Sequence, residues 1–226
     1  KIFDNYFIAP KHGVDIIPHG NYIPFLHIQK DKNKSIDRLS IPKDRTVLLF
    51  FGMIKKVKGL EVLLESLNNV VDKNPNVLLV IAGRTWENDF SYYQEIIDKN
   101  SLSDFCLIHN KFIPHDDVKH YYAASDLVVL PYKRIYQSGV LMMSLSYEKA
   151  VLVSDLEPLT DLIKDDDTGF VFKSGDHYSL SSKLNNILSD KDNLEHIRKK
   201  GFKLIKKKYD WFEIGKQTKK SYQSIL

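Results

Sequence analysis

Short apolar runs alternate with amphipathic stretches along most of the chain. Strands are predicted at residues 46–52, 77–83, 105–108, 127–130, 151–153 and 169–172. Continuous apolar runs of this length are typical of parallel strands that are buried on both faces of a sheet. Between the first two runs, apolar side chains recur at period 3.6 from Leu60 to Val71, which predicts a helix with one buried face.

Further helices are predicted between the later strands, near residues 92–98, 115–123 and 158–163 and from the Ser138–Gly139 turn onward. Strands that alternate with helices predict an α/β fold, a parallel sheet covered on both faces. The remainder, beyond about residue 176, is predicted to be helical with breaks near Asp190, Gly201 and Asp210.

The beginning of the chain does not follow this pattern. Residues 15–22 (DIIPHGNY) are expected to form a short strand followed by a turn. Residues 27–45 are polar and rich in Lys and Asp, a composition that suits a linker. The chain starts with Lys1 rather than Met, which is expected of a fragment.

Composition narrows the class of protein. The 226 residues are enough for one large domain, or for one domain and a piece of another. Hydrophobic residues make up 43% of the chain, and no apolar run is long enough to cross a membrane. Cys106 is the single cysteine, which excludes a disulfide framework and favours a reducing compartment. With no signal peptide, a cytoplasmic location is expected.

Two turns carry the candidate chemistry. The loop Gly52-Met53-Ile54-Lys55-Lys56-Val57-Lys58-Gly59 follows the first predicted strand, and Gln137-Ser138-Gly139 precedes a predicted helix. Glycine lets a ligand approach the backbone, lysines neutralise phosphate, and the N–H groups of a helix start bind anions. Because both turns follow parallel strands, they lie at the carboxyl edge of the sheet, where two such turns suggest a diphosphate site.

Each turn also has a purely structural interpretation. Ser138 is equally suited to an N-cap with Gly139 as a turn residue, and the lysine-rich loop is equally suited to a solvated turn. The loop matches neither the Walker pattern nor G-x-G-x-x-G, so those nucleotide-binding folds gain no support.

Other charged groups are better explained without a ligand. His115 and His120 lack the i, i+4 spacing of a helical metal pair, and the Asp165–Asp167 run is typical of a turn. Basic residues cluster near the C-terminus, at Arg198, Lys199, Lys200, Lys203, Lys206, Lys207 and Lys208. That cluster is either a solvated helix face or a contact for an anionic membrane or nucleic acid. No basic sheet with interleaved aromatic residues and no zinc pattern supports nucleic-acid recognition.

Several motifs in register resemble the family 4 glycosyltransferases. They are FFGMIKKVKGLEVLLESL, LLVIAG, FIPHDDVKHYYAASDLVVLPY, YQSGVLMMSLSYEKAVLVSD and TGFVF, and they lie within residues 46–226. The resemblance implies the GT-B architecture, in which two Rossmann-like domains face each other across a cleft. Residues 1–30 would then be the last strand of the N-terminal acceptor domain and the start of the linker. Residues 31–45 would be the linker, and residues 46–226 the nucleotide-sugar-binding domain with a C-terminal helical segment.

The resemblance also assigns roles to residues. Gly52 and Lys58 stand at the family's first phosphate loop, where the usual arginine is Met53 and Lys55 is expected to supply the second cation. Phe112 and Ile113 stand where backbone groups hold the base. The diphosphate is expected at Gln137, Ser138, Gly139 and Val140. Lys58 and Lys55 would stabilise the leaving diphosphate.

The chain departs from the family at two acidic positions. The family's paired glutamates, separated by seven residues, correspond to Ile135 and Met143. The second glutamate normally binds the ribose hydroxyls, so Met143 would occupy the ribose-binding position.

The resemblance implies sugar transfer from a nucleotide donor with retention and without a metal or other cofactor, in bacterial surface polysaccharide synthesis. The acceptor, a glycan or a lipid-linked sugar, would be held mainly by the absent N-terminal domain, so the isolated chain is expected to be inactive. The alternative is a non-catalytic nucleotide or nucleotide-sugar binding module.

Overall fold

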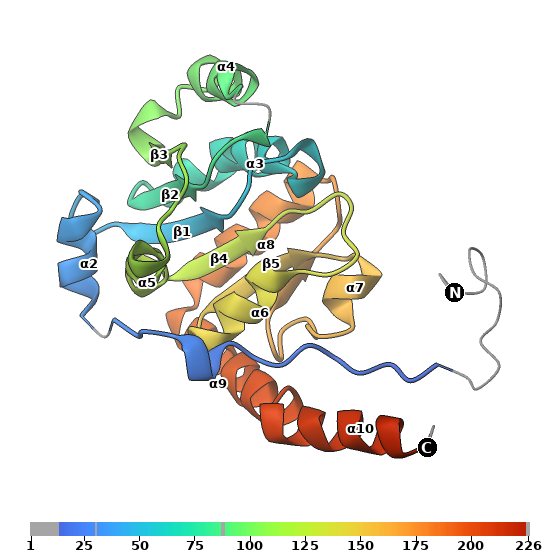
Figure 1. The fold of residues 1–226 in the computed structure, drawn as a ribbon. Coiled ribbons are helices and arrows are strands. Elements are labelled where there is room, and N and C mark those ends of the chain that lie inside the picture. The colour runs from blue at the N-terminus through green and yellow to red at the C-terminus, as the bar shows by residue number, and fades with distance from the viewer. Residues whose placement is uncertain (1–13, 30, 87–88, 225–226) are drawn as a thin grey trace.

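The computed structural model describes residues 14–29, 31–86 and 89–224, in which six parallel strands form one sheet (Figure 1). The strands are β1 (Thr46–Phe51), β2 (Val77–Ala82), β3 (Cys106–His109), β4 (Leu127–Leu130), β5 (Ala150–Ser154) and β6 (Phe170–Phe172). Their order, β3-β2-β1-β4-β5-β6, is that of a doubly wound Rossmann-type sheet. The predicted fold class is therefore confirmed.

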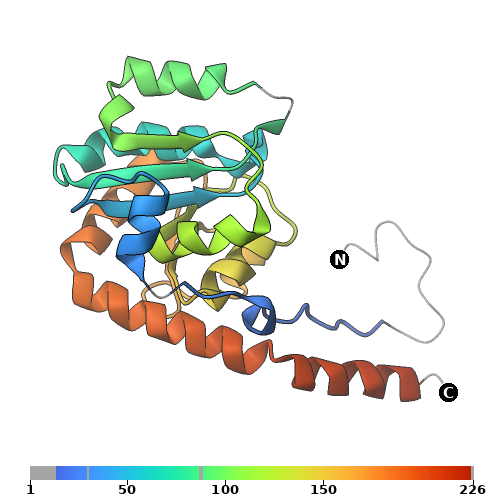
Figure 2. The ribbon, with the colours of Figure 1, turned by 60° about the vertical axis from the view of Figure 1, so that its left-hand side comes forward.

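Helices cover both faces of the sheet (Figures 1 and 2). The α-helices are α2 (Lys32–Arg38), α3 (Leu60–Val71), α4 (Ser91–Lys99), α5 (His115–Ala124), α6 (Gly139–Ser146), α7 (Glu157–Thr160), α8 (His177–Ser189), α9 (Lys191–Lys208) and α10 (Trp211–Gln223). Short 3-10 helices among the described residues include η1 (Ile23–Phe25), η2 (Lys56–Lys58) and η4 (Ser103–Phe105). Helix α3 packs against α4 and α8 on one face, whereas α5 packs against α2, and α6 against α9, on the other.

The two faces hold two separate hydrophobic cores because side chains alternate along each strand. In β1, Val47 and Leu49 point into the core beneath α5 and α6. Leu48 and Phe50 point into the core beneath α3 and α8. All four side chains are essentially inaccessible to solvent, which explains why this strand is a continuous apolar run.

The structure differs from the prediction at Gly201 and adds a helix to the polar segment. The predicted break at Gly201 is wrong, since α9 continues through it from Lys191 to Lys208. A Cβ at Gly201 would lie 2.7 Å from the Thr168 carbonyl oxygen, so the glycine permits a close packing contact. The polar segment expected to be a linker contains α2, whose Ile36 is buried against the α5 side of the sheet.

The segment before α2 lies along the C-terminal helices (Figure 2). Its described part, from residue 14, contains no strand, so the strand expected within residues 15–22 is absent there. The Asn21 N–H donates to the Tyr209 carbonyl at 2.8 Å, and the Trp211 indole N–H donates to the Asn21 carbonyl at 2.7 Å. These bonds fix the segment to the junction of α9 and α10. Residues 1–13 of the predicted acceptor-domain remnant lie outside the described residues.

Candidate functional site

The sheet order places a topological switch point between the carboxyl ends of β1 and β4, and the space outside these strand ends is called the crevice below. The chain winds outward from β1 through β2 to β3, then crosses back so that β4 pairs with the other side of β1. Open α/β sheets bind ligands at such a switch point. The loop after β1 and the loop after β4 border it, and these loops contain the two turns predicted from the sequence.

The loop after β1 lies beside the start of α6 and the end of β4. Gly52 has a φ of 99°, and a Cβ there would approach the Val140 side chain to 3.3 Å. Gly59 has a φ of 66°, and a Cβ there would lie 1.9 Å from the Pro131 carbonyl oxygen. Both positions require glycine, for the left-handed backbone and for the close approach.

Lys58 rests on an aromatic ring at the meeting point of these loops. Its Nζ lies 3.7 Å from the centre of the Tyr132 ring, a cation–π contact. Burial, followed by repulsion from the Lys55 ammonium, lowers the pKa of Lys58 to about 8. No carboxylate among the described residues forms an ion pair with it. A desolvated ammonium of this kind gains from an anionic ligand, because the ligand replaces lost hydration.

Lys55 faces a different ring. Its Nζ lies 3.9 Å from the centre of the Trp86 ring, and it lines a cavity of about 710 Å³ together with Trp86, Tyr92 and Glu61. The two lysines are close enough to repel, but their ammonium groups rest on separate aromatic side chains. The role of Lys55 as the second cation stays a prediction.

Ser138 begins α6 as the sequence predicts. Its hydroxyl accepts a hydrogen bond from the Leu141 N–H at 3.1 Å, which makes it the N-cap. Ser138 is buried, whereas Gln137 and Gly139 are exposed and Val140 is partly exposed. The N–H groups of Gly139 and Val140 belong to the first turn, which has no partners within the helix and carries the positive end of its dipole. This arrangement is suited to an anion, and both the capping and binding interpretations remain compatible with it.

The loop after β3 holds the predicted base-binding pair. Phe112 is 75% exposed, while the Ile113 side chain is buried in the core beneath α5. Only the backbone of Ile113 is therefore available to a ligand. Met53, at the place of the family's arginine, is 45% exposed.

The positions of the two missing glutamates are half-buried. Ile135 and Met143 both pack against the core on the α5 and α6 side. Apolar side chains at these positions add to the packing of α6 and supply no hydrogen-bonding group for ribose.

Residues that sequence reasoning gave no role also shape the crevice. Tyr132 provides the platform under Lys58, and its hydroxyl is buried without a hydrogen-bond partner among the described residues. Burial raises the pKa of this hydroxyl, and nearby Ser138 opposes the rise without a hydrogen bond of full geometry. Gly83, at the end of β2, packs against Gly52 so closely that a Cβ would lie 2.0 Å from the Gly52 carbonyl oxygen. Tyr132 and Gly83 each follow an apolar run in the sequence, and that position is the signal by which they could have been found.

Of the groups set aside as metal ligands, His120 and the Asp165–Asp167 run have other partners. Lys183 pairs with Asp165 and Asp166, and Lys200 pairs with Asp167. The His120 Nδ1 lies 3.1 Å from the Ser35 hydroxyl. Within residues 14–29, 31–86 and 89–224, no group of three or more His, Cys, Asp or Glu side chains is placed to hold a metal ion.

The basic cluster is partly neutralised. Arg198 pairs with Glu148 and Glu195, and Lys199 also reaches Glu195. Among the described residues, no helix has the length and apolar character that crossing a membrane requires.

Comparison with known proteins identifies the family. The model of the family described as glycosyl transferases group 1 matches residues 31–204. The chain therefore belongs to this family, and its fold is that of the Rossmann-like domains of GT-B glycosyltransferases.

Its curated relatives include bacterial enzymes of surface-polysaccharide synthesis. It is 24% identical over 216 residues to the lipopolysaccharide 1,2-N-acetylglucosaminetransferase of Salmonella typhimurium, a match that covers 92% of this chain and 56% of the relative. It is 25% identical over 228 residues to the capsular polysaccharide biosynthesis glycosyltransferase CapM of Staphylococcus aureus, covering 97% of this chain and 57% of the relative. The chain thus spans slightly more than half the length of these relatives.

Solved structures share the fold. The C-terminal domain of a group 1 glycosyl transferase, LpcC, from Francisella tularensis matches with a TM-score of 0.73 and 20% identity, covering 84% of this chain and 98% of that one. Anabaena HepE in complex with UDP and glucose matches with a TM-score of 0.81 and 19% identity, covering 93% of this chain and 57% of that one.

Proposed function

We propose that this chain is the donor-binding lobe of a glycosyltransferase that uses a nucleoside diphosphate sugar and transfers the sugar with retention and without a metal. The observation that carries this proposal is the contact between the Gly52–Gly59 loop and the start of α6, with Lys58 beside them. Membership of the group 1 family supports a transferase. The complexes of HepE with UDP and with UDP-glucose support a nucleotide-sugar donor for a chain of the same fold.

Chemically, the residues would act on the leaving group. As the bond from the sugar to the diphosphate breaks, negative charge grows on the diphosphate and positive charge grows on the sugar ring. Lys58 and the first N–H groups of α6 are preorganised donors for that negative charge, and one such donor is typically worth about 3–4 kcal/mol of barrier. Lys58 is therefore a proposed catalytic residue, with Lys55 as the second cation and Gln137 to Val140 as diphosphate contacts.

The acceptor belongs to the rest of the enzyme. We propose a glycan or lipid-linked acceptor in bacterial surface polysaccharide synthesis, in line with the activities named for the Salmonella and Staphylococcus relatives. It would be held mainly by a preceding domain, so this chain alone is expected to bind donor without turning it over. A cytoplasmic site of action, at the inner face of the membrane, stays a prediction.

Binding of UDP-, GDP- and ADP-sugars to this chain tests the donor site. We expect saturable binding of one nucleotide, weakened at least about tenfold by Lys58→Met and unchanged by Lys56→Met, which removes the same charge from an exposed neighbour. An equal loss of nucleotide affinity in the two variants would show that these lysines attract the nucleotide only through non-specific charge.

Turnover by the full-length protein separates a transferase from a non-catalytic nucleotide-binding module. Lys58→Ala should then reduce sugar transfer severely, and kinetics near those of the wild type would remove this residue from the mechanism. Binding to polyanions alone, lost at moderate salt, would instead favour a charge-driven surface.

A further inference from the structure

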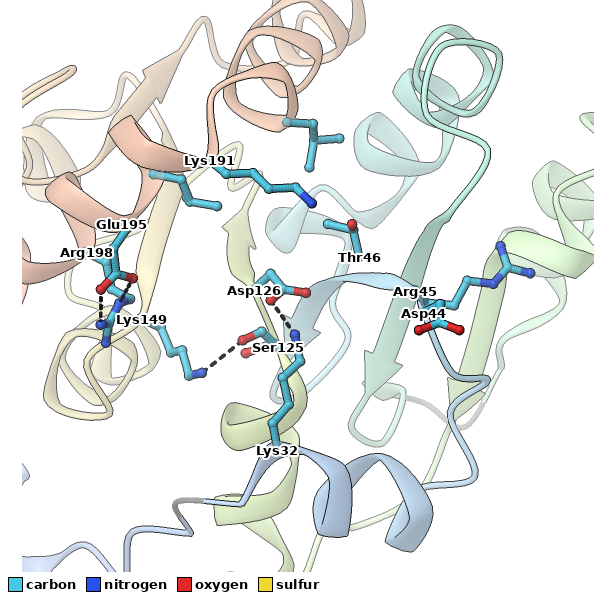
Figure 3. A pocket seen from close by; sticks show the side chains of 12 residues that line it. Lys32, Asp44, Arg45, Thr46, Ser125, Asp126, Lys149, Lys191, Glu195 and Arg198 are labelled. Atoms are coloured by element: carbon cyan, nitrogen blue, oxygen red, sulfur yellow. Dashed lines mark hydrogen bonds and ion pairs between the residues drawn. The ribbon is translucent and has the colours of Figure 1, made fainter.

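A second cavity, of about 580 Å³, lies at the opposite edge of the sheet (Figure 3). Thr46 at the start of β1, Asp126 just before β4 and Lys149 just before β5 form its floor. Helices α2 and α9 contribute its walls. Because the strands are parallel, their amino ends lie across the sheet from the carboxyl ends, so this cavity is separate from the crevice at Lys58. Its volume falls in the range of small-molecule sites.

Basic side chains outnumber acidic ones in the cavity. The basic side chains are Lys32, Arg45, Lys149, Lys191 and Arg198, and the acidic ones are Asp44, Asp126 and Glu195. Two of the acids already have partners. Asp126 forms an ion pair with Lys32 and accepts the Val47 N–H at 2.8 Å. Glu195 pairs with Arg198 at 2.6 Å. The positive charge that remains is therefore located elsewhere in the lining.

Lys149 carries part of this unpaired charge. Its Nζ donates one hydrogen bond, to the Ser125 carbonyl at 2.9 Å, which leaves two donors of the ammonium group without an acceptor among the described residues. No carboxylate in the described part of the chain lies within ion-pair distance of it. Burial is the main cause that lowers the pKa of Lys149 to about 8, with Lys32 and Arg198 acting in the same direction and Asp126 and Glu148 opposing them.

Lys191 brings a second ammonium group to the same space. It is the first residue of α9, and its side chain extends across the cavity toward Thr46 (Figure 3). No described carboxylate pairs with Lys191 either. Two ammonium groups from separate segments thus line one partly open cavity that also contains the Thr46 hydroxyl group.

We propose that this cavity binds a phosphate group, either as the free ion or as the monoester of a small molecule, between Lys149 and Lys191. A dianion matches the two unpaired ammonium charges, and lysine binds phosphate as a point charge without a fixed geometry. The volume exceeds that of a single phosphate, which leaves room for the group that a monoester carries. This site does not depend on the proposed function of the crevice.

Calorimetric titration of this chain with inorganic phosphate, at constant ionic strength set by chloride, tests the proposal. Saturable binding is expected, with affinity lowered at least about tenfold in Lys149→Met and in Lys191→Met. Lys73→Met, which removes an exposed lysine outside the cavity, is the matched control and should bind as the wild type does. Absence of saturable binding, or an equal loss in all three variants, would overturn the proposal.

A further variant and a second probe distinguish phosphate binding in this cavity from binding in the crevice, and a monoester from the free ion. Lys58→Met should leave one phosphate site intact, because the crevice is at the other edge; loss of all phosphate binding in that variant would refute the site. If circular dichroism shows that Lys149→Met is unfolded, the phosphate affinity of Lys191→Met decides the test. Lys191 is exposed, so its substitution is expected to leave the fold intact. Glycerol phosphate distinguishes the sources: tighter binding than inorganic phosphate identifies a monoester, and weaker binding identifies the free ion.

Discussion

The lowered pKa of Lys58 predicts that nucleotide binding consumes a proton. In the free protein, burial and the neighbouring Lys55 hold this pKa at about 8. A bound diphosphate would stabilise the charged ammonium and return the pKa toward the ordinary value of 10.5. The protein must then protonate Lys58 to bind, and above pH 8 this protonation becomes progressively more costly.

The magnitude follows from the two pKa values. Between pH 7 and pH 9.5, the protonated fraction of free Lys58 falls from about nine-tenths to about three-hundredths, while the bound form stays protonated. Affinity should therefore fall about 30-fold over this range, equivalent to about 2 kcal/mol. Near pH 8.5, binding should take up most of a proton per site.

Calorimetry in buffers of different ionisation enthalpy measures both quantities. Lys58→Met is the control, because the ionisation of the nucleotide itself contributes equally in the two proteins. The difference between the two proteins isolates Lys58. An identical pH dependence in the variant would show that the Lys58 ammonium does not meet the diphosphate.

Three substitutions test the scaffold of the crevice and the N-terminal segment. Tyr132→Phe should raise the free energy of unfolding by about 1 kcal/mol in urea titrations, because it removes a buried hydroxyl that has no partner among the described residues; a loss of stability would mean that a partner exists. Gly59→Ala should lower both the melting temperature and nucleotide affinity, since its Cβ would lie 1.9 Å from the Pro131 carbonyl; unchanged affinity would separate this turn from the ligand. Trp211→Phe removes the indole donor to Asn21, so hydrogen exchange at the Asn21 amide should accelerate, and unaltered protection would contradict that anchoring role.

Much of the sheet could be predicted from the sequence because its strands are buried on both faces. The runs at β1, β2, β4 and β5 are continuous and apolar, and the structure buries every residue of β2, β4 and β5. Helix α3 was equally readable, since Leu60, Leu63, Leu64 and Leu67 mark its buried face.

The elements that were missed depend on contacts distant in sequence. Helix α2 lies in a Lys- and Asp-rich stretch and forms against α5 with only Ser35 and Ile36 buried. Gly201 usually weakens a helix, but here its missing side chain lets α9 approach the Thr168 backbone. The apolar pair in residues 15–22 suggested a strand, yet a strand needs a neighbouring edge, and none of the described strands pairs with this segment.

In the candidate site, too, some features could be predicted from the sequence and others could not. Parallel topology alone places the two turns at the carboxyl edge of the sheet, so their position at a common edge could be predicted. The rings beneath Lys58 and Lys55 could not, because Tyr132 and Trp86 come from other loops whose course depends on the packed structure. Nor did the sequence indicate the cavity at the opposite edge, which requires the starts of three strands and two helices to meet.

Both lysines with lowered pKa should also affect stability. A base whose pKa is lower in the folded state binds fewer protons there than in the unfolded chain, so stability rises with pH from about 8 toward 10.5. For the more deeply buried Lys149, the gain between pH 7 and pH 9 is about 1 kcal/mol; the more exposed Lys58 contributes less because solvent screens it. Cys106 from about pH 9, and Tyr93 and Tyr121 from about pH 10, oppose this rise, because burial raises their pKa values to about 12 and the unfolded chain loses these protons first. Urea unfolding at pH 7, 8 and 9 should show the rise in the wild type and a smaller one in Lys149→Met. A stability that falls over this range, or the same slope in both proteins, would mean that the Lys149 ammonium is not desolvated in the fold.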